Sequence, residues 1–364
     1  MSKRLLHIIE SLAPGDVAQQ LLLLARGLRQ YEFDLHLCAL RGGPMFAELR
    51  EAGFEVQILP QRMPIDPFNH VRLKRHIRSL RPDLVQTWQW PASAWGRLAA
   101  IAAHVPRVVA VERELDAWKR WPHWQMDRRL ARRTDCAVYS SSATQEYYRA
   151  HGVQTRADEI IPDAISPQPL RPMRAALLDE LELPPETCLI AACAPLRSES
   201  WLKDLIWATD VLKWVYEQAH LIILGAGPQQ RSLMRYVDCV EVDDCVHLLG
   251  AREDAPAIIA SCDFFWDSTI RDGAALPLLQ ARAAGVPVIA VDTPLHRTLV
   301  QTGETGFLVA LHDRPAYARW THRMLQDAAL RQRIATAEQD QFRQRFSSER
   351  MSASYCSLYH RLLS

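Results

Sequence analysis

The sequence predicts an α/β protein built from two doubly wound parallel sheets. Apolar runs short enough for buried strands alternate with stretches of helical periodicity along almost the whole chain. At 364 residues the chain is also long enough for two hydrophobic cores. Prolines at positions 162, 167, 169 and 172 mark the strongest change in composition, and domain boundaries fall in such stretches. We therefore expect domains at 1–165 and 166–345, followed by a long helix at 346–364.

The bulk composition excludes several classes of protein. A net charge of +1 argues against general nucleic-acid binding, which needs a basic excess. No apolar stretch reaches the roughly 18–20 residues of a membrane span, and the apolar part of the N-terminus is too short for a signal peptide. The histidines and cysteines show no metal-ligand spacing, so no metal site is expected. These features predict a cytoplasmic protein.

The first half begins with a strand at 5–9, a turn at Pro14-Gly15-Asp16 and a helix at 17–28. A glycine turn that leads into a helix presents free backbone N–H groups to an anion. A plain strand-helix unit without a ligand explains the same residues equally well. The alternation continues with strands at 33–40, 54–59 and 84–87 and helices at 45–52 and 66–80.

The most basic stretch of the chain lies at 118–133, where tryptophans interleave the charges. A helix beginning near Pro122 would gather several arginines on one side, which suits peripheral contact with anionic lipid or a charged acceptor. The alternative is a solvated basic face whose tryptophans pack on the domain. Asp127 and Pro122 interrupt a clean membrane-facing stripe and favour that alternative.

The second half repeats the pattern with strands at 189–193, 220–224, 246–248, 263–266 and 288–291. Its central stretch, 264–292, reads as strand, polar loop, helix and strand. Gly285 is placed where a helix C-terminus needs positive φ, and Pro287 prevents continuation. The loop lies at a strand's carboxyl end, where open α/β sheets bind ligands. A second glycine-containing turn, with Gly225 and Gly227, follows another strand and would let a nucleotide approach the backbone.

The order of residues in this central stretch resembles the donor-site signature of retaining glycosyltransferases of family 4, which have the GT-B fold. The matching positions are Ser268, Asp272, Gly273, Gln280, Ala281, Ala283, Gly285, Pro287 and Val288. The motif is degenerate, because Asp272 and Gln280 replace the two glutamates of the family's E-x7-E pair. The segments 82–114 and 302–309 also resemble family patterns.

The resemblance implies two Rossmann-like domains facing each other across a cleft, with the last helix crossing back to the first domain. It implies transfer of a sugar from a nucleotide-sugar donor to a glycan, lipid-linked or small-molecule acceptor, with retention of configuration and no metal or other cofactor. Asp272 would lie beside the transferred sugar, and Gln280 would hold the ribose. Gly15 and the loop at 197–200 would contact the diphosphate, and the base would lie near 225–228 and 246–250.

Three further positions depart from the family pattern. Arg113 occupies the place of a catalytic-site histidine and is our second catalytic candidate. Pro195 and Ser200 occupy the places of an arginine and a lysine that bind the diphosphate. Arg197 and Lys203 are nearby cations that could compensate, and Arg197 is the better candidate because it lies in the loop. Both could also be plain surface charges.

Two functions therefore stay open on the sequence alone. The first is an active glycosyltransferase with an altered donor site. The second is a catalytically silent GT-B protein that binds a nucleotide or glycan, or acts as a partner subunit. The presence of a compensating cation near Pro195 and Ser200 would favour the active glycosyltransferase over the silent protein. A GT-B epimerase is a weaker third alternative, because the order of the family-4 motifs is well kept.

Overall fold

The computed structural model describes residues 2–13, 15–60, 67–165, 173–270 and 276–364. The predicted site residues Asp272 and Gly273 lie outside these ranges. The chain divides into two compact units, and each is described by itself. The first unit combines Met1–Ser166 with Ser347–Ser364, and the second is Pro167–Phe346. The sequence places the boundaries after 165 and after 345.

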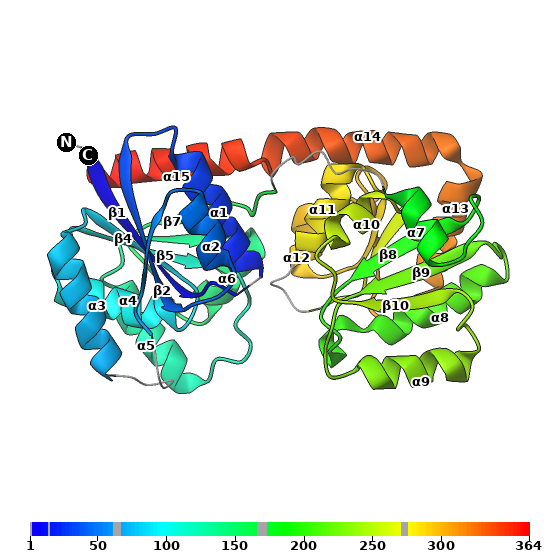
Figure 1. Cartoon of the computed structure of the whole chain (residues 1–364), viewed down its shortest axis with the longest axis horizontal. Coiled ribbons are helices and arrows are strands. Elements are labelled where there is room, and N and C mark those ends of the chain that lie inside the picture. Colours follow the sequence, from blue (N-terminus) through cyan, green and yellow to red (C-terminus); the bar gives the residue numbers. More distant parts are fainter. Residues whose placement is uncertain (1, 14, 61–66, 166–172, 271–275) are drawn as a thin grey trace. The chain divides into compact units, whose positions relative to one another are not determined.

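The first unit is built on a seven-stranded parallel sheet with the order β3-β2-β1-β4-β5-β6-β7 (Figure 1). The chain starts in the middle of this sheet, winds to one edge and then to the other. The strands are β1 (Lys3–Ser11), β2 (Phe33–Arg41), β3 (Glu55–Ile58), β4 (Leu84–Trp88), β5 (Arg107–Glu112), β6 (Cys136–Tyr139) and β7 (Asp158–Ile160). The winding direction reverses between β1 and β4, and ligands bind beyond the carboxyl ends of strands at such a point.

Helices cover both faces of this sheet. The helices of the unit are α1 (Asp16–Leu28), α2 (Met45–Glu51), α3 (Pro67–Leu80), α4 (Ala92–Ala102), α5 (Trp121–Ala131), α6 (Ser142–Ala150) and α15 (Ser348–Leu363). Apolar side chains of α1, α2 and α15 share one core with the sheet, and those of α3 and α4 form the core on the other face. In α1, the predicted stripe of Leu21, Leu24 and Leu28 is buried, which confirms the periodicity.

The C-terminal helix α15 belongs to the first unit although it follows the second in sequence. It packs closely on α1, because a Cβ at Gly27 would lie only 1.8 Å from the Ser352 hydroxyl oxygen. Its Tyr359 hydroxyl donates to Gln86 Oε1 at 2.8 Å and lies 3.2 Å from His7 Nε2. These contacts fix α15 to the two central strands β1 and β4.

His7 should make the stability of the first unit depend on pH. Complete burial lowers the pKa of His7 to about 3 from 6.5. Below pH 6.5 the unfolded chain therefore binds a proton at His7 that the folded unit does not bind. The contribution of His7 to the free energy of unfolding is fully present above pH 6.5 and is lost as pH falls towards 3. The expected slope is about 1.4 kcal/mol per pH unit. Urea unfolding at several pH values should show a shallower slope for His7→Gln, and equal slopes would contradict this assignment.

The second unit repeats the architecture on a six-stranded parallel sheet with the order β10-β9-β8-β11-β12-β13. The strands are β8 (Cys188–Cys193), β9 (Ala219–Leu224), β10 (Val246–Gly250), β11 (Phe264–Asp267), β12 (Val288–Val291) and β13 (Phe307–Val309). Five of these were predicted. Periodicity does not predict β13, because three residues are too few to show an alternation. The winding direction reverses between β8 and β11.

Helices flank this second sheet as well. They are α7 (Arg174–Glu180), the 3₁₀ turn η1 (Ser198–Ser200), α8 (Leu202–Lys213), α9 (Gln230–Val240), α10 (Ala255–Ala260), α11 (Leu276–Ala284), α12 (Pro294–Leu299), α13 (Arg314–Gln326) and α14 (Ala328–Arg345). One core joins α8, α9, α13 and α14 to the sheet. Gly285 ends α11 with φ of 73°, as the sequence predicts. None of the described helices combines the length and apolar character that crossing a bilayer requires.

Candidate functional site

A pocket opens in the first unit at the carboxyl ends of β1, β4 and β5, beside the point where the winding reverses. Its volume is about 350 Å³, within the range of small-molecule sites. The end of β1 and the loops that follow β4 and β5 form the wall. The lining residues are Glu10, Gln89, Trp90, Pro91, Glu114, Asp116 and Trp118. Four of these residues lie in the segment 82–114 and Trp118 begins the stretch 118–133, but the pocket could not be predicted because only the sheet order brings its loops together.

The aromatic side chains of this pocket hold one another in place. The rings of Trp90, Trp118 and His123 contact each other edge to face, with centroids 5.3–6.2 Å apart. The Trp118 indole N–H donates to Asp116 Oδ1 at 3.0 Å, which fixes the orientation of the ring. Trp118 is still 43% exposed, so part of its face is available to a ligand.

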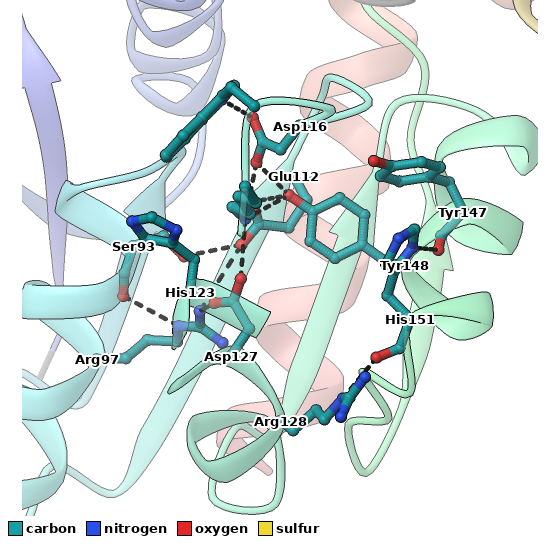
Figure 2. A network of polar contacts seen from close by, with 12 residues as sticks. Ser93, Arg97, Glu112, Asp116, His123, Asp127, Arg128, Tyr147, Tyr148 and His151 are labelled. Atoms are coloured by element: carbon teal, nitrogen blue, oxygen red, sulfur yellow. Dashed lines mark hydrogen bonds and ion pairs between the residues drawn. The ribbon is translucent and has the colours of Figure 1, made fainter. Parts of the chain in front are cut away.

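A buried network of ion pairs and hydrogen bonds includes the pocket residue Asp116 (Figure 2). Asp127 lies at its centre, 2.6 Å from Arg97 Nη2 and 2.9 Å from Lys119 Nζ. Lys119 also lies 2.7 Å from Asp116 Oδ2. The Tyr148 hydroxyl lies 2.6 Å from Asp116 Oδ2 and 2.9 Å from Glu112 Oε2. The network therefore ties the loop after β5 to α4, α5 and α6.

The charges in this network do not balance on their own. Among the described side chains, three carboxylates, Glu112, Asp116 and Asp127, face the two cations Arg97 and Lys119. Burial raises the pKa of Glu112, and the other carboxylates add to this effect against the two cations. Burial alone would lower the pKa of Lys119, but the surrounding carboxylates outweigh it and raise the pKa. Lys119 therefore carries a positive charge that the neighbouring carboxylates Asp116 and Asp127 already neutralise.

Arg113, the second catalytic candidate, lies beneath the surface with its side chain 5% exposed. Its guanidinium forms an ion pair with Asp163. Burial raises the pKa of Asp163, and Arg113 opposes that rise. In the described structure the Arg113 charge is directed to this internal carboxylate.

The turn at Gly15 begins α1, and Gly15 N-caps the helix without a side-chain hydrogen bond. The first helical residue, Asp16, is in an electrostatic cluster with Arg113, Asp163 and Glu114. Burial raises the pKa of Asp16 to about 6, with Arg113 acting in the opposite direction. The described surroundings of this helix N-terminus are therefore more acidic than the glycine turn alone suggests. The predicted role of Gly15 towards a phosphate stays a prediction.

The basic stretch 118–133 forms the loop before α5 and α5 itself, rather than one continuous charged face. Trp124 is 6% exposed and stacks on His151 at 4.1 Å, and the Arg128 Nε donates to the His151 carbonyl. Asp127 points into the ion network, as Figure 2 shows. Trp121 remains 71% exposed. Trp124 therefore packs on its own domain, as the alternative interpretation expects, whereas Trp118 and Trp121 are exposed.

In the second unit, three loops meet at the carboxyl ends of β8, β9 and β11. The Ser200 hydroxyl donates to the Pro195 carbonyl at 2.6 Å, and the Ser268 hydroxyl donates to the Ser200 carbonyl at 2.6 Å. Leu196 N–H donates to the Ala226 carbonyl at 3.1 Å. Ser200, at the family's lysine position, is thus a buried residue that fixes the loop, and the position offers no charge to a phosphate.

Gly225 and Gly227 make close packing between these loops possible. A Cβ at Gly225, which has φ of 135°, would lie 2.0 Å from the Ala194 carbonyl oxygen. A Cβ at Gly227 would lie 2.5 Å from the Leu196 carbonyl oxygen. Each glycine therefore allows the turn after β9 to pack against the loop after β8. Their predicted contact with a nucleotide stays a prediction.

The two candidate cations of this unit differ in their surroundings. Arg197 is exposed and N-caps η1 in the loop after β8. Lys203 lies in the first turn of α8, with Nζ 5.1 Å from the centroid of the Tyr236 ring on α9. Gln280 is half-buried on α11. Arg197 is therefore the candidate that is better placed to reach a ligand, in agreement with the preference from sequence.

A buried histidine–aspartate pair lies at the same edge of the second sheet and was not predicted. His296 Nε2 lies 3.3 Å from Asp267 Oδ2, and His296 Nδ1 donates to the Val291 carbonyl at 2.6 Å. Burial alone would raise the pKa of Asp267, but His296 and the Thr269 N–H outweigh burial and lower it. The pair fixes the end of β11, from which the chain continues towards Asp272.

Family models match both units of the chain. The model described as "Glycosyltransferase Family 4" matches residues 17–168, and the model described as "Glycosyl transferases group 1" matches residues 189–327. A Bacillus subtilis protein designated glycosyltransferase EpsD is 25% identical over 76% of this chain and 81% of its own length. The chain is a GT-B glycosyltransferase of family 4.

Other comparisons agree with this assignment. A Mycobacterium tuberculosis protein named GDP-mannose-dependent alpha-(1-6)-phosphatidylinositol monomannoside mannosyltransferase is 26% identical to this glycosyltransferase over 78% of the chain and 77% of its own length. The crystal structure of Anabaena HepE in complex with UDP superposes with a TM-score of 0.87 at 17% identity, covering 98% of this chain and all of HepE. That structural likeness shows the fold of this glycosyltransferase, with its two parallel-sheet domains.

Proposed function

We propose that this glycosyltransferase transfers a sugar from a nucleotide-sugar donor, with retention of configuration, to a glycan, lipid-linked or small-molecule acceptor. The observation that supports the donor site most directly is the set of interlocked loops after β8, β9 and β11. They hold Arg197 exposed at the carboxyl edge of the second sheet, where open α/β sheets bind ligands. HepE, which has the same fold, was crystallised with UDP-glucose.

The chemistry requires groups that favour departure of the nucleoside diphosphate. Negative charge grows on the diphosphate and positive charge on the sugar carbon, so a cation and a carboxylate at the two ends both stabilise the transition state. In this proposal Arg197 faces the phosphates, Gln280 holds the ribose and Asp272 lies beside the sugar. No metal ion is required in this scheme, because the cation is a side chain. A catalytically silent binding protein is the less favoured alternative, since the relatives with long matches are named as glycosyltransferases.

Arg197→Ala should weaken nucleotide binding about 10- to 100-fold, because it removes a charge-assisted hydrogen bond to the diphosphate. Lys203→Ala is the matched control. Its ammonium group lies over the Tyr236 ring, so a smaller loss is expected. Calorimetric titration with UDP, GDP and ADP measures both variants, and thermal unfolding checks that both fold. An equal loss for both variants would show that Arg197 has no special role.

Gly15→Val tests the predicted phosphate contact of the first unit. A Cβ at Gly15 meets no atom within 4 Å, and its φ of 165° is extended backbone that any residue adopts. We therefore expect unchanged thermal stability but weaker binding of the intact donor, because the valine side chain would fill the space of the diphosphate. Unchanged affinity in both Gly15→Val and Arg197→Ala would refute this placement of the phosphates.

Contact with a membrane surface is a separate part of the proposal. Trp121 is 71% exposed in the first turn of α5, and the last turn carries Arg128 and Arg129, an arrangement that suits weak binding to anionic headgroups. Sedimentation with phosphatidylglycerol vesicles should show salt-sensitive binding that decreases in Trp121→Ala. The exposed Trp214→Ala provides a control on the second unit. The absence of binding at low salt would remove membrane contact through this stretch.

A further inference from the structure

The pocket of the first unit has an acidic and aromatic wall. Among the described residues that line it, Glu10, Glu114 and Asp116 carry carboxylates, and none is a lysine or arginine. Asp116 already accepts hydrogen bonds from Trp118 and Tyr148. Arg41 Nη1 lies 3.6 Å from Glu10 Oε1, so the three carboxylates outnumber this exposed cation, and an anionic ligand would meet an excess of like charge.

A second cation near this wall, Lys119, is already paired with carboxylates of the protein. Lys119 lies behind Trp90, with Nζ 5.6 Å from the centroid of the ring. Its side chain is 1% exposed and pairs with Asp116 and Asp127. Lys119 therefore stabilises the aromatic wall from the protein side, and it does not attract a phosphate or carboxylate into the pocket.

The aromatic part of the wall suits the apolar face of a sugar ring. Trp118 is 43% exposed, and its ring is held by Asp116, Trp90 and His123. A flat, oriented ring of this kind packs against the C–H groups on one face of a pyranose. Carboxylate oxygens at the rim accept hydrogen bonds from sugar hydroxyls. The volume of about 350 Å³ is that of a small-molecule site.

From these observations we propose that this pocket binds the acceptor as an uncharged saccharide and excludes anionic acceptors. The sugar ring lies on Trp118, and its hydroxyls bond to Glu10 and Glu114. The proposal rests on the glycosyltransferase function proposed above and adds the chemical class of the acceptor.

Binding of simple glycosides to the full-length protein tests the proposal without the donor. Saturation-transfer NMR would compare neutral methyl glycosides of glucose, mannose and galactose, and the disaccharide maltose, with methyl glucuronide, glucose 6-phosphate and methyl glucosaminide. We expect binding of at least one neutral glycoside and none of the glucuronide or the phosphate. Trp118→Ala and Trp118→Leu should both weaken neutral binding by roughly 3- to 10-fold. Trp214→Ala, on the exposed surface of the second unit, should leave it unchanged.

Glu10→Gln keeps the shape of the wall and removes one charge. It should weaken the binding of neutral glycosides, because a charge-assisted hydrogen bond becomes a neutral one, and it should reduce the discrimination against glucuronide.

Three results would overturn the proposal. They are preferential binding of an anionic sugar, binding of the glucosaminide alone, and no binding of any neutral glycoside. Neutral binding that both Trp118 variants leave unchanged would overturn it as well.

The donor function is tested independently of this result. Nucleotide affinity and donor hydrolysis are measured for the parent protein in the absence of any acceptor. Loss of the donor activities with intact glycoside binding would refute the proposed function alone. Intact donor activities without neutral glycoside binding would refute only the assignment of the acceptor.

Discussion

Asp127→Ala is expected to destabilise the first unit by about 3–5 kcal/mol, because two buried cations lose the carboxylate that hydrogen-bonds both of them. Asp127 is 1% exposed and bonds both Arg97 and Lys119, whose side chains are 2% and 1% exposed. Removing one member of a buried ion pair costs more than the pair contributes, since the remaining charge keeps its desolvation penalty. The loop after β5 should loosen at the same time, because Lys119 loses one of its two ionic contacts.

Urea unfolding measures this effect, and an exposed ion pair provides the control. Asp244 pairs with Lys213 at 2.6 Å but is 61% exposed, so Asp244→Ala should cost less than about 1 kcal/mol. Asp127→Asn should fall between the two, since it keeps the shape of the side chain and one of its two acceptor oxygens. A similar small cost for Asp127→Ala and Asp244→Ala would show that the network contributes little to stability.

Asp272→Asn is expected to reduce turnover about 100-fold and to leave nucleotide affinity nearly unchanged. The reason is that Asp272 is predicted to contact the transferred sugar, where charge develops in the transition state, and not the nucleotide. Donor hydrolysis and sugar transfer give the rate, and calorimetry gives the nucleotide affinity. Glu304→Gln removes an exposed carboxylate from the same unit and should change neither quantity. A proportional loss of both quantities in Asp272→Asn would place Asp272 at the nucleotide instead.

Gln280→Glu restores the family's second acidic residue and should be tolerated. It should increase donor affinity by restoring a charge-assisted hydrogen bond to the ribose, by roughly 10-fold. Undetectable turnover in the parent protein, in Asp272→Asn and in Gln280→Glu, with every donor tested, would favour a catalytically silent binding protein. A gain in affinity without turnover would indicate a nucleotide-binding subunit.

The sheets could be predicted because their signals are local. Strand residues such as Leu189–Cys193 form continuous apolar runs, and the prolines after Ile161 mark the change of unit. Gly285 could be placed because only a residue that accepts positive φ fits the end of α11. β13 was missed, since its three residues carry too little pattern.

The candidate sites were harder to predict because they depend on residues far apart in the chain. Arg113 is predicted to be catalytic, and its ion pair with Asp163, 50 residues later, is visible only in the structure. Gly225 and Gly227 were predicted from their spacing, but the packing against Ala194 and Leu196 is visible only when the loops are placed.

The return of α15 to the first unit has a consequence for the order in which the protein can fold during synthesis. The second unit is one unbroken segment and can fold as soon as residue 346 has left the ribosome. The first unit cannot finish folding until its last 18 residues have been synthesised. Until then the apolar surface of α1 that Met351 and Tyr355 cover is exposed to solvent. Ile165 and Ser347 form a β-bridge, so the two ends between which the second unit is inserted lie side by side. If the second unit is replaced by a short linker from Ile165 to Ser347, the first unit becomes one continuous segment. We expect this shortened chain to fold without the inserted domain.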